Sequence, residues 1–246
     1  MKTKKGHRIK VIIISILSVL AVIFASFFIY VSQYYHATSD VDELILKEKD
    51  VEINDKRKYY SLVSKNQTSK AGLIFYPGGK VEAKAYIPLC YTLAQSGFNV
   101  FLTKMPFNLA VFDKDAADGV LTDYPEEEEW YLAGHSLGGA MAASYINSNH
   151  MKFKGLILLG AYSTADLSKT GLKTMTIYGS EDGVMNRDKY KANYHNLPAD
   201  NQEVIIQGGS HCFFGNYGFQ KGDHEATITR EEQQKQTALK ISGLLS

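Results

Sequence analysis

The chain has 246 residues, with 27 basic and 26 acidic side chains and a formal net charge of +1. A chain of this length can bury the core of one domain. The charge balance argues against a nucleic-acid surface or another polyanionic partner. Two cysteines, Cys90 and Cys212, are too few for a disulfide framework, and we expect two unpaired thiols. No Cys/His spacing indicates a zinc site.

The first segment is basic and is followed by an uncharged apolar run over residues 11–32. As a helix this run would be about 33 Å long, enough to cross a bilayer. A cleaved secretory signal is the competing interpretation, but its apolar region is usually about 7–15 residues long. Bulky side chains also occupy the end of the run, where small cleavage-site residues would be expected: Phe27, Phe28, Ile29 and Tyr30. We therefore predict an uncleaved transmembrane helix in contact with the lipid bilayer.

The charges on the two sides of this helix predict its orientation. The basic flank, residues 1–10, should stay in the cytoplasm, because cytoplasmic segments next to membrane helices are enriched in Lys and Arg. The far side carries Asp40, Asp42 and Glu43. The expected topology is a single-pass protein of the cell membrane, with the N-terminus in the cytoplasm and the chain after residue 32 outside the cell. Tyr30, Tyr34 and Tyr35 suit the outer membrane–water boundary.

Residues 33–70 are polar and rich in lysine, and we interpret them as a tether followed by edge strands. Residues 51–53 and 59–63 alternate weakly between apolar and polar side chains, as short strands at a sheet edge do.

From residue 71 onward, apolar strands alternate with helices, which predicts one domain over residues 71–246. Strands are expected at residues 72–76, 98–102, 129–133, 155–160, 174–179 and 204–206. Helices are expected at residues 83–95, 108–120, 137–147 and 230–245. Such alternation is typical of an α/β fold, with a mostly parallel sheet covered by helices on both faces.

The strand at residues 129–133 leads into Gly134-His135-Ser136-Leu137-Gly138, followed by an Ala- and Gly-rich helix. This fits the G-x-S-x-G nucleophile elbow, in which a strand-to-helix turn exposes a serine hydroxyl. The stretch Gly-His-Ser-Leu-Gly-Gly resembles the elbow of the α/β-hydrolase superfamily, and the resemblance extends from about residue 71 to the C-terminus. It is closest to small bacterial membrane-anchored α/β hydrolases. The resemblance implies that Ser136 is the catalytic nucleophile.

In this superfamily the chain order is nucleophile, acid, histidine, each on a loop after a strand. The loop after residues 174–179 contains Glu181 and Asp182, and Asp182 occupies the position of the family's acid. Glu181, one residue earlier, is the competitor.

After the last expected strand comes Gly208-Gly209-Ser210-His211-Cys212. A histidine in a glycine-rich loop at this place resembles the family's catalytic base, which implies that His211 takes the proton of Ser136. His224 is the rival, since it also lies in a loop near the C-terminus, but no strand directly precedes it.

The oxyanion hole would combine the N–H of Leu137, at the start of the helix, with one from the loop Pro77-Gly78-Gly79-Lys80. Many relatives have His-Gly-Gly or His-Gly where this chain has Pro77. We choose the N–H of Gly79, and those of Gly78 and Lys80 stay open. A phosphate-binding loop is excluded, because the Gly-Lys-Ser/Thr ending is absent.

The resemblance implies a membrane-anchored serine hydrolase that cleaves small-molecule esters or related acyl compounds through Ser136, His211 and Asp182, with no cofactor. The short connection over residues 160–173 leaves no room for a large lid domain. Acyl transfer and peptide cleavage stay open as reactions of the same triad. A non-catalytic binding module and a secreted soluble hydrolase are also compatible with the sequence.

Overall fold

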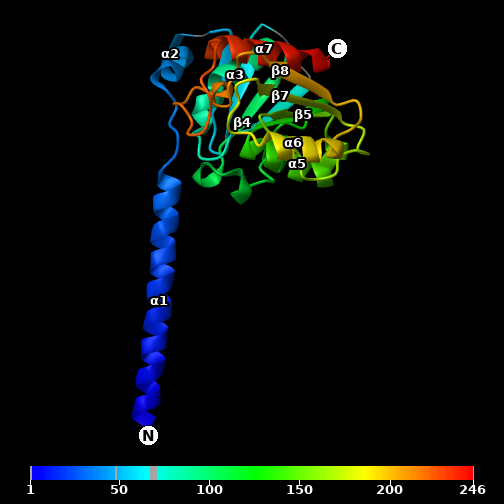
Figure 1. The fold of residues 1–246 in the computed structure, drawn as a ribbon. Coiled ribbons are helices and arrows are strands. Elements are labelled where there is room, and N and C mark those ends of the chain that lie inside the picture. Colours follow the sequence, from blue (N-terminus) through cyan, green and yellow to red (C-terminus); the bar gives the residue numbers. More distant parts are fainter. Residues whose placement is uncertain (1, 48, 67–70, 246) are drawn as a thin grey trace. The chain divides into compact units, whose positions relative to one another are not determined.

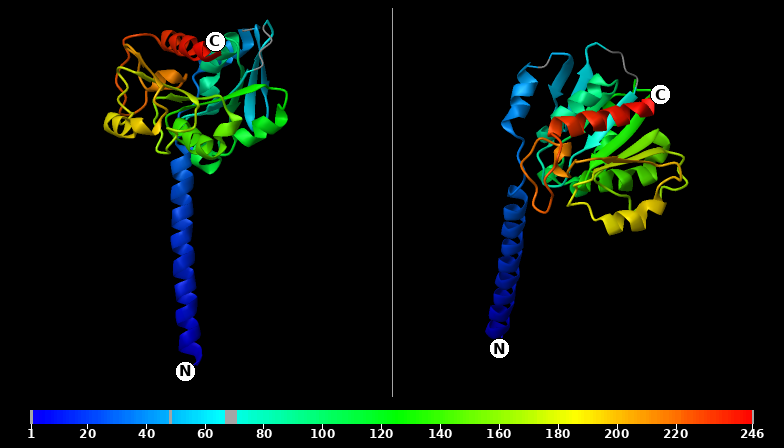
Figure 2. Two further views of the ribbon diagram at one scale, coloured as in Figure 1. Left: turned by 90° about the vertical axis from the view of Figure 1, so that its right-hand side faces the viewer. Right: turned by 45° about the horizontal axis from the view of Figure 1, so that its top comes forward.

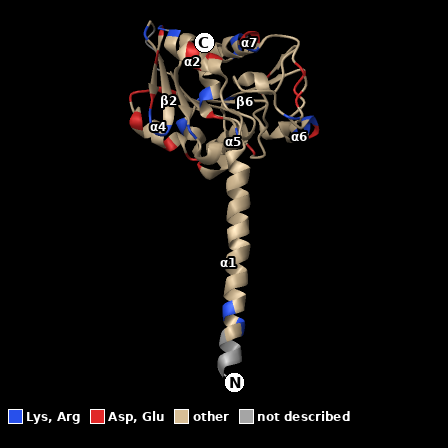
Figure 3. Cartoon of the chain, turned by 90° about the vertical axis from the view of Figure 1, so that its left-hand side faces the viewer, with Lys and Arg blue, Asp and Glu red and all other residues tan. Residues whose placement is uncertain are grey.

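The structure is a computed structural model that describes residues 2–47, 49–66 and 71–245. The chain divides after Tyr34 into two compact units. The first unit contains helix α1 (Lys2–Ser32), and Figure 3 shows basic residues only near its N-terminal end and no acidic ones. Residues 7–32 of this helix form a segment that is long and apolar enough to cross a membrane. A helix of this kind serves as a membrane anchor or as a signal sequence.

The second unit is built on one eight-stranded sheet, in the order β1-β2-β4-β3-β5-β6-β7-β8. Strands β3 to β8 run parallel, and β2 is antiparallel to both β4 and β1. The strands are β1 (Val51–Asp55), β2 (Tyr59–Ser64), β3 (Ala71–Tyr76), β4 (Asn99–Thr103), β5 (Glu129–His135), β6 (Gly155–Leu159), β7 (Lys173–Gly179) and β8 (Gln202–Ile206). The expected mostly parallel sheet is confirmed, and β1 and β2 lie at one end of its strand order.

Helices cover both faces of this sheet, as Figures 1 and 2 show. Side chains alternate between the faces, so that Leu73 and Phe75 pack with helices α3 and α7 while Ile74 and Tyr76 pack with α4 and α5. The helices of this unit are α2 (Ser39–Lys47), α3 (Ile87–Gln95), α4 (Ala117–Asp123), α5 (Leu137–Asn149), α6 (Arg187–Asn193) and α7 (Arg230–Ser242). Both cysteines are buried and unpaired.

Helix α2 replaces part of the predicted tether. Val41, Leu44 and Ile45 lie three and four positions apart, so they share one face of the helix, and all three pack on the main hydrophobic core. The polar composition of residues 33–70 hid this short amphipathic pattern.

The helix expected at residues 108–120 is wrong. The structure has two 3-10 turns, Pro106–Asn108 and Ala110–Phe112, and helix α4 begins only at Ala117. Phe107 and Asn108 both have a φ of 55°, which an α-helix does not tolerate. Helix α6 lies outside the helical ranges expected from the sequence.

Candidate active site

The candidate site lies where the strand order reverses. Strand β3 pairs with β4 on one side and with β5 on the other, so that the loops after β3 and β5 leave the sheet at a topological switch point. Crevices at the carboxyl ends of parallel strands are the usual ligand sites of such sheets. The loops that follow β3, β5, β7 and β8 carry the four groups of residues selected from the sequence.

Ser136 occupies the sharp turn between β5 and α5. Its backbone has φ 52° and ψ −122°, a strained conformation for a residue with a side chain, at a cost of about 1–3 kcal/mol. Its N–H donates to the carbonyl of Leu159 at 2.9 Å, and its own carbonyl accepts from the N–H of Ala140 at 3.1 Å. A Cβ at Gly138 would lie 2.2 Å from the carbonyl oxygen of Pro77, so only glycine fits there. The turn is therefore held in place by its neighbours.

Asp182 and His211 form a buried pair. Oδ2 of Asp182 and Nδ1 of His211 are 2.8 Å apart, and the two side chains are 0 and 1% exposed. The other carboxylate oxygen, Oδ1, accepts the N–H groups of Val184 and Met185 at 2.9 and 2.8 Å. Gly160 provides the space for the ring, because a Cβ there would lie 2.8 Å from Nδ1 of His211. The carboxylate thus fixes the imidazole through one oxygen and is itself fixed through the other.

The competing candidates, Glu181 and His224, do not join this pair. The carboxylate of Glu181 accepts the Ser180 hydroxyl at 2.8 Å, and His224 is exposed beside the acid loop. Neither side chain takes part in the Asp182–His211 bond.

Ser136 and His211 line the same cavity, which has a volume of about 350 Å³. Nε2 of His211 is buried and makes no hydrogen bond to any residue that the structure describes. The structure therefore brings the hydroxyl and the imidazole into one cavity without a bond between them. A buried polar atom without a hydrogen bond is costly and calls for an explanation, of which a catalytic role is one.

The loop after β3 presents one unengaged amide toward the elbow. The N–H of Gly78 donates to the Tyr86 hydroxyl at 3.1 Å, and the N–H of Lys80 donates to the carbonyl of Asn108 at 2.7 Å. The N–H of Gly79 has no partner within the described ranges. A Cβ at Gly79 would lie 2.7 Å from Cδ2 of Leu137, so this glycine lies directly beside the start of α5. Of the three amides considered for the oxyanion hole, only that of Gly79 is available.

The sequence matches the family described as "Alpha/beta hydrolase family" over residues 72–235. The chain belongs to the α/β-hydrolase family. The match contains β3, the elbow, the acid loop and the histidine loop, and no curated protein matches the sequence.

Solved structures of similar fold include proteins described as a hydrolase, an esterase and a lipase. A predicted CIB-like hydrolase from Thermoplasma acidophilum is 15% identical, with a TM-score of 0.56, covering 78% of this chain and 97% of its own. The esterase domain of a Rhodothermus marinus protein is 11% identical, with a TM-score of 0.59 and coverages of 79% and 97%. A monoacylglycerol lipase from Paleococcus ferrophilus is 13% identical, with a TM-score of 0.58 and coverages of 78% and 99%. At these identities the likeness is one of fold.

The α/β hydrolase uses a second buried carboxylate, Asp223, to join the acid and histidine loops. Oδ1 accepts the N–H groups of Gly183, His211 and His224 at 3.1, 3.2 and 3.0 Å, and Oδ2 accepts that of Cys212 at 2.8 Å. Burial alone would raise the pKa of Asp223, but these backbone bonds outweigh it and hold the pKa below its usual range. Sequence reasoning missed this role, because no motif in the loop around His224 singles out Asp223.

Replacing Asp223 with asparagine should lower kcat of the hydrolase by about 10²-fold. The side chain holds the backbone of His211, and a displaced His211 imidazole would slow the reaction by about this factor. Both carboxylate oxygens of Asp223 accept backbone N–H groups. The NH2 of an asparagine cannot accept a hydrogen bond, so wherever it lies at least one of these bonds is lost. KM should change little. Steady-state kinetics of Asp223→Asn beside the exposed neighbour Glu225→Gln measure this, and equal rates in both variants would contradict it.

His135, the variable residue of the elbow, is buried beside His211. Its Nδ1 lies 2.7 Å from the Tyr86 hydroxyl, and its ring centroid is 4.4 Å from that of His211. Because the Tyr86 oxygen already accepts the N–H of Gly78, its proton is available for Nδ1 of His135. Burial, followed by repulsion from His211, holds the pKa of His135 well below 6.5. Tyr86 and His135 thus connect the loop after β3 to the elbow.

The depressed pKa of His135 predicts acid sensitivity of the hydrolase. Below about pH 6.5 the unfolded chain binds a proton at His135 that the folded chain does not bind. The free energy of unfolding is therefore unaffected by this group above that pH. Below it, the free energy of unfolding falls by ~1.4 kcal/mol per pH unit because of His135. Urea unfolding of the full chain in detergent, over a pH series, measures the slope. His135→Gln should flatten it relative to the exposed control His195→Gln, and equal slopes would refute the assignment.

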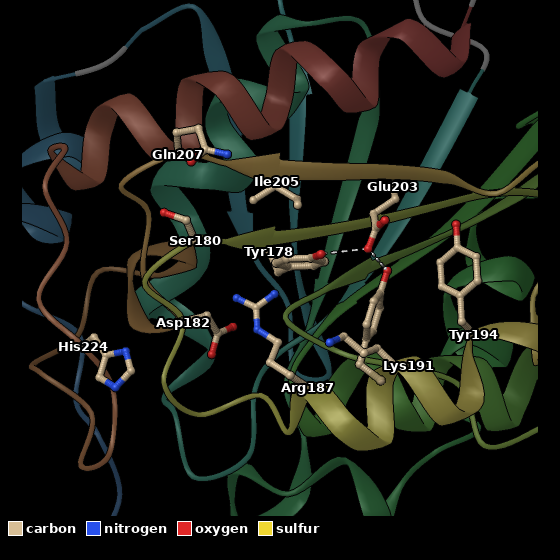
Figure 4. A pocket seen from close by; sticks show the side chains of 11 residues that line it. Tyr178, Ser180, Asp182, Arg187, Lys191, Tyr194, Glu203, Ile205, Gln207 and His224 are labelled. Carbon is tan, nitrogen blue, oxygen red and sulfur yellow. Dashed lines mark hydrogen bonds between the residues drawn. The ribbon is translucent and has the colours of Figure 1, made fainter.

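A larger cavity of about 850 Å³ lies behind the acid loop. In Figure 4, Arg187 and Lys191 point into it, and Glu203 accepts the hydroxyls of Tyr178 and Tyr190 at 2.8 and 2.7 Å. Asp182 reaches its edge, but Ser136 and His211 do not line it. The smaller cavity is therefore the candidate active site of the hydrolase.

Proposed function

We propose that this α/β hydrolase is a membrane-anchored serine hydrolase that cleaves carboxylic esters. The observation that carries the proposal is the buried Asp182–His211 pair, whose unbonded Nε2 lies in the same cavity as the strained Ser136. An esterase and a lipase among proteins of similar fold support the ester class.

In the proposed reaction, the Ser136 hydroxyl turns toward His211, and Nε2 takes its proton as the oxygen attacks the ester carbonyl. Asp182 keeps the Nδ1 proton of His211 in place and stabilises the imidazolium. The N–H groups of Leu137 and Gly79 receive the negative charge on the carbonyl oxygen. His211 then returns the proton to the departing alcohol. Water, activated by the same ring, releases the acid from the acyl-enzyme.

The anchor is part of the proposal. The span over residues 11–32 would remain in the membrane, with the basic N-terminus in the cytoplasm and the catalytic unit outside, because Lys and Arg favour the cytoplasmic side.

A fluorophosphonate probe tests the proposed chemistry, since it reacts with activated serines. The full chain, purified in detergent, should be labelled on the peptide that contains Ser136, and labelling should stop once an ester substrate saturates the site. Labelling at another residue, or none in a folded sample, would exclude this serine hydrolase.

A further inference from the structure

Three large apolar side chains are exposed on the loop that follows β4. Phe107, Val111 and Phe112 are 46, 49 and 50% exposed, and the rings of Phe107 and Phe112 meet edge to face at 5.7 Å. We refer to these three residues as the apolar rim. The rim belongs to the neighbourhood of the site, because the 3-10 turn Ala110–Phe112 packs against α5, the helix that begins after Ser136.

The chain enters the catalytic unit at a fixed point next to this rim. The N–H of Tyr35 donates to the carbonyl of Lys80 at 2.7 Å, and the carbonyl of Tyr35 accepts the N–H of Glu82 at 2.9 Å. The N–H of Lys80 donates to the carbonyl of Asn108, in the rim loop. Lys80, in the loop after β3, is therefore bonded both to Tyr35 at the entry point and to Asn108 in the rim loop.

The entry segment is firmly attached. The ring of Tyr35 packs on that of Tyr217 at 5.6 Å, and the N–H of Thr38 donates to the carbonyl of Asn216 at 3.0 Å. Tyr35 therefore moves with the catalytic unit rather than with the preceding chain.

Tyr35 follows Ser32, the end of α1, by only three positions. Three extended residues reach about 11 Å at most, whatever the angle between the helix and the catalytic unit. If residues 11–32 span a bilayer, Tyr35 is held within that distance of its surface, and the rim loop is held close beside it. Segments that lie in this boundary bury apolar side chains such as Phe and Leu about 5–10 Å deep in it.

We propose that the apolar rim inserts into the surface of the bilayer and that the hydrolase takes its substrate from it, as an acyl ester of a membrane lipid. The substrate class rests on the proposed esterase function, whereas membrane contact of the rim rests only on the anchor. The cavity suits an acyl chain: apart from the reacting groups it is lined largely by Leu137, Ala140, Ala161, Tyr162, Val184 and Met185. Its volume of about 350 Å³ is at the small end of ligand pockets and favours a single chain.

Site-specific fluorescence tests the membrane contact directly. Cys90 and Cys212 are buried, and burial raises the pKa of both thiols, so a thiol-reactive NBD label will react at an introduced cysteine. Two full-length variants are labelled and reconstituted in phosphatidylcholine vesicles: Phe112→Cys in the rim, and Leu239→Cys at an exposed position of α7. Nitroxide lipids should quench the label at position 112 at least about twofold and leave that at position 239 nearly unchanged. Equal quenching at both positions would overturn the proposal.

Kinetics test the substrate class. The double variant Phe107→Ser/Phe112→Ser should lower the ratio of the rate on 1-palmitoylglycerol in vesicles to that on soluble p-nitrophenyl acetate by about tenfold. The control Leu239→Ser should keep the parent ratio. An unchanged ratio in the double variant would overturn the lipid substrate. If the parent cleaves neither ester, the esterase proposal fails, and the fluorescence result still decides whether the rim contacts the membrane.

Discussion

Replacing Ser136 with alanine is expected to lower kcat for ester hydrolysis by about 10⁴- to 10⁶-fold and to abolish fluorophosphonate labelling. The substitution removes the protein atom to which the proposal assigns bond formation with the acyl carbon. His211, Asp182 and the two backbone amides remain, so substrate should still bind with a dissociation constant close to that of the parent. Kinetics and labelling of the full chain in detergent measure both effects.

Stability separates this expected loss from a loss of fold. Alanine keeps the Cβ, so Ser136→Ala keeps the strained φ of 52° and should unfold at the same urea concentration as the parent. Ser144→Ala is the matched control on the same helix, because Ser144 is half-buried on α5 and has no part in the mechanism. A Ser136→Ala protein that retains both turnover and labelling would place the nucleophile elsewhere.

The elbow could be predicted from sequence because its pattern is local, although the turn also packs against the end of β3. Gly134, Ser136 and Gly138 lie within one turn, and the contacts that exclude side chains at both glycines involve this turn and the end of β3. The loops of Asp182 and His211 could be predicted for a related reason: each directly follows an apolar strand, and parallel strands bring their carboxyl ends to the same edge.

The supporting contacts could not be predicted, because they join residues far apart in the chain. The bond between Tyr86 and His135 connects α3's N-cap residue to the elbow, and Asp223 receives an N–H group from Gly183, forty positions earlier. No spacing rule indicates such pairs. The same cause explains the wrong helix at residues 108–120, where the apolar pattern suggested a helix but the loop is bonded to Lys80 and to the Tyr76 hydroxyl instead.

Replacing Asp182 with asparagine should lower kcat by about 10⁴-fold with little change in KM. The contacts of Asp182 determine the orientation of the amide that replaces its carboxylate. The N–H groups of Val184 and Met185 both point at Oδ1, so the amide oxygen has to occupy that position and the NH2 has to face His211. Nδ1 would then accept a hydrogen bond, and the proton of the neutral imidazole would move to Nε2. An Nε2 that already carries a proton cannot take the one from Ser136.

Glu181→Gln is the matched control, because Glu181 is the adjacent acidic residue and its carboxylate accepts the Ser180 hydroxyl. Its kcat should stay within about twofold of the parent, while Asp182→Asn recovers activity as rising pH increases the supply of hydroxide as a substitute base. Rates of both variants across a pH series, with fluorophosphonate labelling as the second readout, distinguish the two carboxylates. A larger loss in Glu181→Gln than in Asp182→Asn would mean that Glu181 orients the imidazole, which would have to turn away from its present partner.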